Sequence, residues 1–320
     1  MFLAFGLGQY PVYPGELVKI LLSRVFNIAR TWSETAETVV FSIRLPRIIA
    51  GIVIGAGLSV AGASYQGMFR NPIVSPDALG ASAGAGFGAA LSILLGLGWA
   101  ATSALSFAIG LAAVMVAYAI GRLFKGDQVL GLVLAGIMVG TLFTSFTSFI
   151  KFIADTDNVL PAITYWLMGS LPRRMKDIFP GIVPVVVGVI PLFVLRWQLN
   201  LLTVSEDEAR SMGVNTGALR AVVIACSTLV TAACVAMSGM VGWIGLVIPH
   251  FCRLLFGHDN RHVIPASLLM GAAYLLVVDT VARVVAAVEV PIGILTAVIG
   301  APVFIYLMLS GGGWRNGNRS

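Results

Sequence analysis

The sequence predicts an all-α membrane protein, a polytopic bundle of helices, and three observations support this fold class. The chain of 320 residues is 58% hydrophobic and only 11% charged, which is too little polar surface for a soluble fold. Its apolar runs are long and continuous, whereas a membrane barrel would need short alternating strands. It also holds 36 glycines, many inside these runs, as expected where helix backbones pack closely in a bilayer.

Nine apolar runs have about the length, near 20 residues, that a helix needs to cross the hydrocarbon. Ahead of them, Met1–Gly8 is apolar but too short to cross. Residues 14–27 place leucines at helical spacing opposite charged residues, which predicts a helix lying at the membrane surface. The nine predicted spans are 46–69, 79–97, 99–121, 128–152, 177–196, 218–238, 241–257, 263–287 and 292–310.

Small residues recur at four-residue spacing within the predicted spans. Gly51 and Gly55 form one pair, and Gly80, Gly84 and Gly88 extend the pattern over two turns. Without large side chains, two helix backbones can approach closely and gain packing energy that the bilayer does not otherwise supply. Close packing therefore accounts for most of these glycines without a functional role.

One polar segment, TVSEDEARSMGVNTG at residues 203–217, interrupts the apolar sequence. Ser205 and Glu208 form a capping box, in which each side chain can bond the backbone N–H of the other residue. The acidic residues fall at the positive end of the predicted helix, and Arg210 falls near its negative end. Gly213 supplies a left-handed stop. The pattern predicts a helix of two turns.

Asn215 or Thr216 can cap the helix that follows this segment. A helix of two turns is marginal in water by itself, so its good caps suggest that another molecule packs against it. The two interpretations are an ordinary connecting loop and a docking helix for a water-soluble partner. We favour the docking helix.

Motifs and composition argue against several kinds of protein. The chain has no G-x-x-x-x-G-K-[ST] motif and no H-E-x-x-H motif, so it does not bind ATP through a P-loop or zinc as a metalloprotease does. Its three cysteines lack metal-ligand spacing, and we expect no cofactor or metal in this chain. Basic loops account for the net charge of +6 better than a nucleic-acid surface does. A serine within GASY, residues 62–65, would fit an intramembrane protease only with a partnering base, which no motif supplies.

Asp279 is the clearest acidic residue inside a predicted span, and Arg283 follows it by one helical turn. Opposite charges at this spacing can neutralise each other. Acids at membrane depth also serve ion coupling, so a proton relay is the alternative. We expect a structural pair.

Three long motifs carry a resemblance to a known family. Together they resemble the permease subunits of type II ABC importers, which move iron–siderophore complexes, haem, cobalamin or molybdate. The similarity runs from about Val12 to Ser310 and implies one transmembrane permease domain, 1–320, with about ten helices. Only Met1–Gly8 corresponds to the family's first helix, so nine full spans are expected. The motifs are RLPRIIAGIVIGAGLSVAGASYQGMFRNPIVSPDALGASAGAG at 44–86, SGMVGWIGLVIPHFCRLLFGHDNRHVIP at 238–265 and VPIGILTAVIGAPVFIYLML at 290–309.

The resemblance implies two docking surfaces. Residues 203–217 correspond to the cytoplasmic coupling segment that contacts the ATPase in this family. The expected ATPase contacts are Ser205, Glu208, Ala209, Arg210, Met212 and Gly213. The outer face of the family carries arginines that meet acidic residues of a binding protein, a role that suits the planar guanidinium. The corresponding residues are Arg44, Arg47 and Arg283, with snorkelling at the head groups as the alternative.

The resemblance also implies a gate and a pathway. Asn71, Pro72 and Ile73 resemble the inner gate region of the family. Among the hydroxyl residues of the predicted span 128–152, Thr144 and Ser145 are the candidates to line the pathway. They can equally bond carbonyls of their own helix.

These features together predict a transport permease rather than an enzyme. The resemblance implies a homodimer in the cell inner or plasma membrane, a cytoplasmic ABC ATPase dimer that uses ATP and Mg, and a periplasmic or lipoprotein binding protein. An iron complex, siderophore or haem, is the expected cargo, followed by cobalamin and molybdate. The rival is an ion-coupled secondary transporter in which residues 203–217 are an inert loop. The family topology puts both chain ends in the cytoplasm, but basic residues divide evenly between the two predicted sides, so charge gives no orientation.

Overall fold

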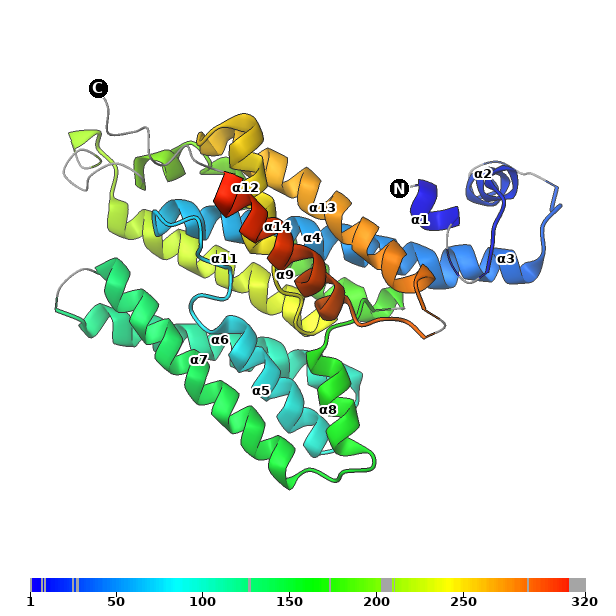
Figure 1. Ribbon diagram of the computed structural model, residues 1–320, viewed down its shortest axis with the longest axis horizontal. Coiled ribbons are helices and arrows are strands. Elements are labelled where there is room, and N and C mark those ends of the chain that lie inside the picture. The colour runs from blue at the N-terminus through cyan, green and yellow to red at the C-terminus, as the bar shows by residue number, and fades with distance from the viewer. Residues whose placement is uncertain are drawn as a thin grey trace.

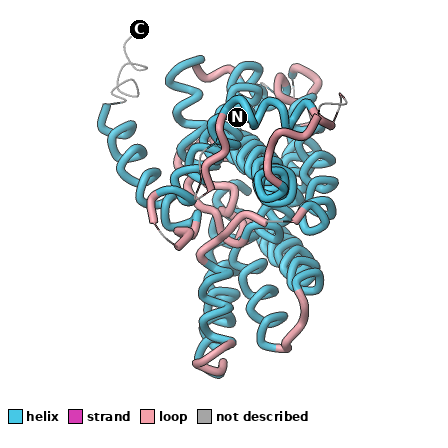
Figure 2. The backbone as a smooth tube through the Cα atoms, turned by 90° about the vertical axis from the view of Figure 1, so that its right-hand side faces the viewer, coloured by secondary structure: helices cyan, strands magenta, loops and turns pink. Residues whose placement is uncertain are grey.

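The computed structural model is a bundle of helices that run along one long axis (Figure 1). It describes residues 2–6, 8, 10–24, 26, 29–125, 128–172, 174–202, 209, 211–286 and 288–310. Within these ranges the chain forms helices and loops and no strand, as Figure 2 shows from the end of the bundle that carries α1. The predicted all-α class is therefore confirmed.

Each of the nine predicted spans contains a helix whose ends lie within a few residues of the predicted ends. Bilayer thickness and continuous apolar runs were sufficient to locate them. These helices are α4 (Leu45–Met68), α5 (Ala81–Leu94), α6 (Trp99–Leu123), α7 (Gln128–Ile153), α9 (Met175–Val194), α11 (Thr216–Ser238), α12 (Ile244–Phe256), α13 (Asn260–Val284) and α14 (Ile292–Ser310). The shorter elements are α1 (Phe2–Gly6), α2 (Pro14–Leu22), α3 (Glu34–Thr38), the π-helix η1 (Val39–Arg44), α8 (Val159–Leu167) and the 3₁₀-helix η2 (Gln198–Leu202).

Six helices of the described chain are long and apolar enough to cross a membrane, and three apolar helices, α5, α12 and α14, are shorter. At 1.5 Å per residue, the 14 residues of α5 span about 21 Å, less than the roughly 30 Å of hydrocarbon. The nine predicted runs are therefore six helices of full spanning length and three shorter apolar helices.

The first long helix begins earlier than the sequence predicts. α3, η1 and α4 form one continuous helix of 35 residues, Glu34–Met68, whose first turn is capped by the Ser33 hydroxyl accepting the N–H of Ala36 at 3.1 Å. Pro46 lies within this continuous helix, although proline lacks an N–H and is best tolerated in a first turn. The wider turn of η1 lies immediately ahead of it and lets the helix continue through the proline.

The predicted surface helix exists as α2, but its buried face contacts the protein. Leu17 and Ile20 pack against Val12, Trp32 and neighbouring residues of the same cluster. The sequence pattern gave the right periodicity, and an amphipathic face does not reveal whether lipid or protein covers it.

α4 and α11 lie at the centre of the bundle. α4 packs against α13, α11, α12 and α9, while α5, α6 and α7 pack on one another and meet the rest through α11. Gly55 of α4 faces Gly271 of α13 so closely that a Cβ atom on either would lie 2.3 Å from the other's carbonyl oxygen. Gly84 and Gly88 similarly face the backbone of α6. Close backbone packing by these predicted glycines is confirmed.

The two ends of the bundle carry different loops. One, which we call the arginine end, holds Arg44, Arg47 and Arg283 together with α1 and α2; the other, the η2 end, holds η2 and the start of α13. α1 lies at the arginine end, and α14 runs toward the opposite end of the bundle (Figure 1). The placement of both chain ends in the cytoplasm stays a prediction.

Candidate functional site

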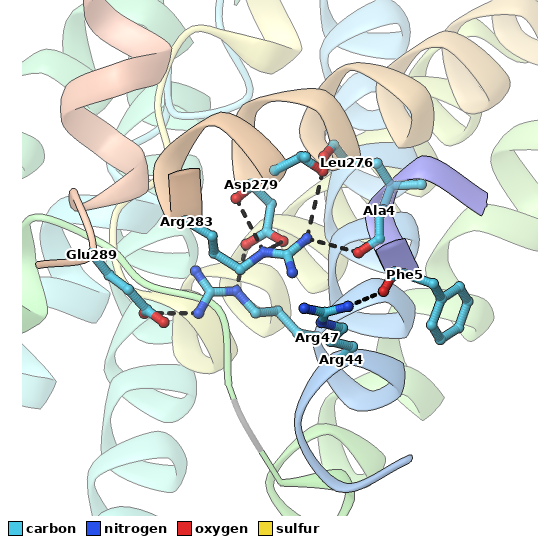
Figure 3. Close-up of polar contacts among 9 residues, drawn as sticks. Ala4, Phe5, Arg44, Arg47, Leu276, Asp279, Arg283 and Glu289 are labelled. Carbon is cyan, nitrogen blue, oxygen red and sulfur yellow. Dashed lines mark hydrogen bonds and ion pairs between the residues drawn. The ribbon is translucent and has the colours of Figure 1, made fainter. Parts of the chain in front are cut away.

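Three arginines that are far apart in the sequence meet at the arginine end (Figure 3). Arg44 ends η1, Arg47 lies in the first turn of α4, and Arg283 lies in the last turn of α13. They are only 3%, 3% and 7% exposed. The close packing of α4 on α13 brings these helix ends together.

One carboxylate holds two of these arginines. Asp279 accepts Arg47 Nε at 2.5 Å and pairs with Arg283 Nε at 3.0 Å through its second oxygen. Arg47 also pairs with Glu289 at 2.8 Å through Nη1. The predicted structural pair of Asp279 and Arg283 is confirmed. The sequence analysis did not predict Glu289 or the contact of Arg47 with Asp279. The latter two residues are 232 positions apart, and no local sequence pattern indicates a contact over such a separation.

Arg44 lies beside this network without an ion pair among the described residues. Its guanidinium donates instead to the backbone carbonyls of Phe5 and Tyr10, and Arg283 Nη2 donates to the carbonyl of Ala4 at 3.1 Å. Carbonyls of the N-terminal segment therefore cover the cluster. Counting only described residues, the three arginines and two carboxylates of the cluster leave one surplus positive charge. The docking role of the three arginines stays a prediction.

A hollow of about 530 Å³ opens between α7 and the loop that precedes α5. Asp77 lies at one side, where it accepts the N–H of Ser82 at 2.7 Å. Thr144 and Ser145 line the hollow, and each donates its hydroxyl proton to the carbonyl four residues earlier, at 2.8 and 2.9 Å. The two side chains therefore line the hollow and also bond carbonyls of their own helix. Their role in transport stays a prediction. A hydroxyl that donates to its own helix offers only lone pairs to the hollow.

The predicted gate residues form a tight turn after α4. Asn71 accepts the N–H of Ile73 at 2.9 Å through its side chain, and Ile73 is exposed. Arg70, just before the turn, has a left-handed φ of 51° and donates through Nε to the carbonyl of Leu202 at 2.7 Å. The gate assignment of Asn71, Pro72 and Ile73 remains a prediction, but the turn is tied to η2.

The predicted coupling segment is described only in part. Ser205, Glu208 and Arg210 lie outside the described residues, and so does the capping box. Ala209 is buried and Met212 is exposed. Gly213 has φ +78°, and Val214 donates to the carbonyl of Ala209 at 3.2 Å, which is the bond of a Schellman stop. Gly213 is therefore confirmed as the left-handed stop.

The helix that follows is capped as predicted. The Asn215 side chain accepts the N–H of Ala218 at 3.0 Å and begins α11. This was the first of the two proposed caps, and an asparagine in this position satisfies one of the free N–H groups of the first turn.

Two further contacts at the η2 end were missed. Asn200 Nδ2 donates to Asp259 at 2.6 Å, and Arg253 donates to the Gln66 side chain and to the carbonyl of Ala63. The available signal for these contacts in the sequence was the position of the polar side chains next to the ends of apolar runs. In the described part of the chain, no group of three or more His, Cys, Asp or Glu residues is placed to hold a metal ion.

Comparison with known proteins agrees with this architecture. The FecCD transport family matches residues 1–310. The molybdate import system permease MolB of Haemophilus influenzae is 37% identical over 97% of this chain and 93% of its own length. A Helicobacter pylori protein named "Probable iron chelatin transport system permease protein" is 40% identical over 84% and 82%. The cobalamin import permease BtuC of Halobacterium salinarum is 39% identical over 86% and 74%.

Solved structures show the same fold. A chain from an inward-facing ABC transporter classed as metal-chelate type has a TM-score of 0.82 and 37% identity, covering 93% of this chain and 99% of that one. A chain of PsaBC from Streptococcus pneumoniae, solved with a Fab, has a TM-score of 0.61 at 17% identity, over 95% and 98% of the two chains, so it shows the fold alone. The chain is a multi-pass membrane protein of the FecCD transport family, whose members are permeases of ABC importers.

Proposed function

We propose that two copies of this chain form the permease of an ATP-driven importer that moves an iron complex, siderophore or haem, into the cytoplasm. The observation that carries the proposal is the placement of two different polar surfaces at opposite ends of one bundle. The arginine end would receive an extracytoplasmic binding protein, and the η2 end a cytoplasmic ATPase dimer. The chain itself needs no cofactor, since ATP and Mg act in the partner ATPase.

The η2 end supports the ATPase contact. The Schellman stop at Gly213 and the cap at Asn215 define the exit of the segment 203–217 into α11. The exposed side chain of Met212 is available to a partner beside Gly213. A short segment held in this way can transmit a push better than a flexible loop can. In this orientation the membrane is the cell inner or plasma membrane, with the end of α14 in the cytoplasm.

The arginine end supports the proposed contact with a binding protein. Among the described residues its network has one surplus positive charge, and Arg44 donates to neutral carbonyls. A buried cation without a counter-charge is poorly compensated, so a carboxylate from a partner would be attracted to it. Arg47 and Arg283 are already paired with Asp279. Arg44 is therefore the main docking cation, and Arg47 and Arg283 have a supporting role.

The position and lining of the hollow support two parts of the proposal, that two copies form the pathway and that an iron complex is the cargo. Thr144 and Ser145 are exposed on one copy, so a second copy is needed to close the pathway on the opposite side. The wall offers a carboxylate and hydroxyl lone pairs, and none of the described residues that line it is basic. Such a wall gives no hydrogen-bond donors to a small oxyanion, whereas a chelate brings its own donors and apolar surface. This favours an iron complex over molybdate.

The names of the relatives leave two other cargoes to be tested. One relative is a cobalamin permease and one a molybdate permease, at 39% and 37% identity. The chain is to be reconstituted in vesicles with its ATPase and binding protein, and uptake of radiolabelled ferric siderophore, haem, cobalamin and molybdate compared. We expect ATP-dependent uptake of an iron complex. Uptake of cobalamin or molybdate alone would overturn the cargo, and uptake driven by an ion gradient without ATP would overturn the importer.

A further inference from the structure

A second, smaller cavity of about 310 Å³ lies at the η2 end, where α6 ends and α7 and α11 begin. It shares no lining residue with the hollow described above, which lies farther along α7. None of the described residues that line it is acidic. The lining therefore combines positive charge with several hydrogen-bond donors. Its polar side chains are Tyr118 and Arg122 of α6, Gln128 of α7 and Arg220 of α11.

Arg122 is the side chain best placed to bind a ligand in this cavity. Its guanidinium lies over the ring of Tyr118, 5.9 Å from the centroid. A cation–π contact of this kind holds the guanidinium in place without occupying its N–H donors. Arg122 is exposed and forms no ion pair with any described residue. Arg220 has a further interaction within the chain, so it adds charge while Arg122 supplies the free donors.

The donors of the cavity suit a phosphate group. The planar guanidinium of an arginine binds phosphate oxygens through two parallel N–H bonds. The amide of Gln128 and the hydroxyl of Tyr118 add uncharged donors from two other sides. With about 310 Å³ the cavity is at the small end of ligand pockets, which suits a headgroup whose remaining parts stay outside.

The surface beside the cavity indicates where the phosphate comes from. α6 is one of the helices long and apolar enough to cross a membrane. Ala119 and Met115 lie three and seven residues before Arg122, so they share its face of α6, and both are exposed, Met115 by 71%. Leu123, next to Arg122, is 80% exposed. A phosphate at the end of a helix, with an apolar face leading away from it along the membrane, matches the shape of a phospholipid.

We propose that this cavity binds the headgroup of an acidic phospholipid in the leaflet at the η2 end, with Arg122 as its main contact. The charge of the described lining favours an acidic headgroup over a zwitterionic one. Only the choice of leaflet rests on the function proposed above, which makes it the cytoplasmic one, where acidic lipids attract basic residues beside helix ends. The cavity walls come from α6, α7 and α11, so the bound headgroup holds the start of α7 against the other two helices.

Thermal unfolding of the full chain in detergent tests the site. Phosphatidylglycerol and phosphatidylcholine with identical acyl chains are added separately, because both carry a phosphate but only the first has a net charge. We expect phosphatidylglycerol to raise the unfolding temperature by several degrees in a saturable way, since a ligand that binds only the folded state stabilises it. The increase should shrink at high ionic strength. Equal stabilisation by the two lipids would overturn the proposal.

Arg122→Gln tests the assigned contact. The side chain is exposed, so the variant should unfold near the wild-type temperature when no lipid is added. The phosphatidylglycerol concentration that gives half of the stabilisation should rise at least about fivefold. Arg122→Lys keeps the charge and should fall between the variant and the wild type. An unchanged lipid affinity of Arg122→Gln would remove the site.

The matched control is Lys125→Gln. Lys125 is exposed three residues after Arg122 but does not line the cavity. Its substitution removes the same charge from the same end and should leave the lipid affinity near that of the wild type. If it weakens binding as much as Arg122→Gln does, the effect comes from overall charge and the assigned site is wrong.

Glycerol phosphate and the partner ATPase test the two other possible occupants. Free glycerol phosphate lacks acyl chains and should stabilise the chain far less than phosphatidylglycerol at equal concentration. Equal stabilisation would assign the cavity to a soluble anion, and displacement of the lipid by added ATPase, followed by native mass spectrometry, would assign it to a protein contact. Either result overturns the lipid proposal. The lipid measurements need neither ATPase nor cargo, so their failure leaves the proposed function untouched.

Discussion

The arginine end and the η2 end are both polar, but they are built from different interactions. At the arginine end, charged side chains are buried and share carboxylates, with Asp279 between Arg47 and Arg283. At the η2 end, most contacts join one side chain to a backbone group or an amide, and Asp259 is partly exposed. The first arrangement is costly to break, and the second can be remade during a cycle. The comparison indicates that the arginine end is the more rigid of the two and the η2 end the more adjustable.

The physical reason is the cost of an unpaired charge. Removing one partner of a buried ion pair leaves the other charge without water or a counter-ion, which costs about 3–5 kcal/mol. Removing a partly exposed hydrogen bond costs about 1 kcal/mol, since water replaces the lost partner. Equivalent substitutions at the two ends should therefore have unequal effects on stability.

The largest effect is expected for Asp279→Asn. The variant leaves Arg47 and Arg283 buried side by side without their shared carboxylate, although Arg47 keeps Glu289. We expect the free energy of unfolding to fall by about 3–5 kcal/mol, measured by thermal unfolding of the detergent-solubilised protein. The control is Asp155→Asn, an exposed acid at the same end, which should change stability by less than about 0.5 kcal/mol. Equal effects of the two variants would remove the distinction between the ends.

The next prediction compares the stability of variants at Arg44 and at Arg47. Arg47→Met removes a partner from both Asp279 and Glu289 and should destabilise the protein by about 2–4 kcal/mol. Arg44→Met removes no ion pair of the described chain, so its stability should change by about 1 kcal/mol. Its affinity for the binding protein, measured by surface plasmon resonance, should fall at least about tenfold. If Arg44→Met binds normally, the surplus charge is not the docking site.

The sequence predicted the fold well, because the bilayer restricts the chain to helices of nearly fixed length. Continuous apolar runs therefore located nine helices, and glycine spacing identified contacts such as that of Gly55 with Gly271. The sequence did not show that α5 and α12 are shorter than a full span, because an apolar run can continue past the end of its helix, as it does through Leu95 and Leu97 after α5. Hydropathy measures the surroundings of a residue and not its backbone conformation.

The candidate site was predictable only where its signals were local. The Gly213 stop, the Asn215 cap and the pair of Asp279 with Arg283 each depend on residues within one or two turns. Contacts of Arg47 with Asp279, or of Asn200 with Asp259, join distant segments and need the packed structure. The N-terminal carbonyls over Arg44 could not be read from side-chain types at all.

A smaller effect is expected for Gly213→Ala at the η2 end. A left-handed φ of +78° costs an alanine about 1–2 kcal/mol, while no atom of the described residues lies within 4 Å of where its Cβ would be. The penalty is local, so global stability should fall by no more than this amount. Contact with the ATPase, measured by co-purification, should weaken more than contact with the binding protein. The opposite order would place the ATPase contact elsewhere.

The smallest effect concerns pH at Asp259. The backbone N–H of Arg261, and then the Asn200 amide, lower the pKa of this carboxyl below its usual 3.8, with smaller help from the charges of Arg261 and His262 and a small opposing effect of burial. A lowered folded pKa means that Asp259 contributes stability above the unfolded value and loses it as pH falls through the folded one. The advantage of the wild type over Asp259→Asn in thermal unfolding should thus be constant from pH 7 to about 5 and shrink below about 4. Solvent screens the partly exposed carboxylate, so the change should be smaller than for Asp279→Asn, Arg47→Met, Arg44→Met and Gly213→Ala. An advantage that grows toward low pH would mean that Asp259 is held in its protonated form, and the amide would then have to be reassigned as an acceptor from it.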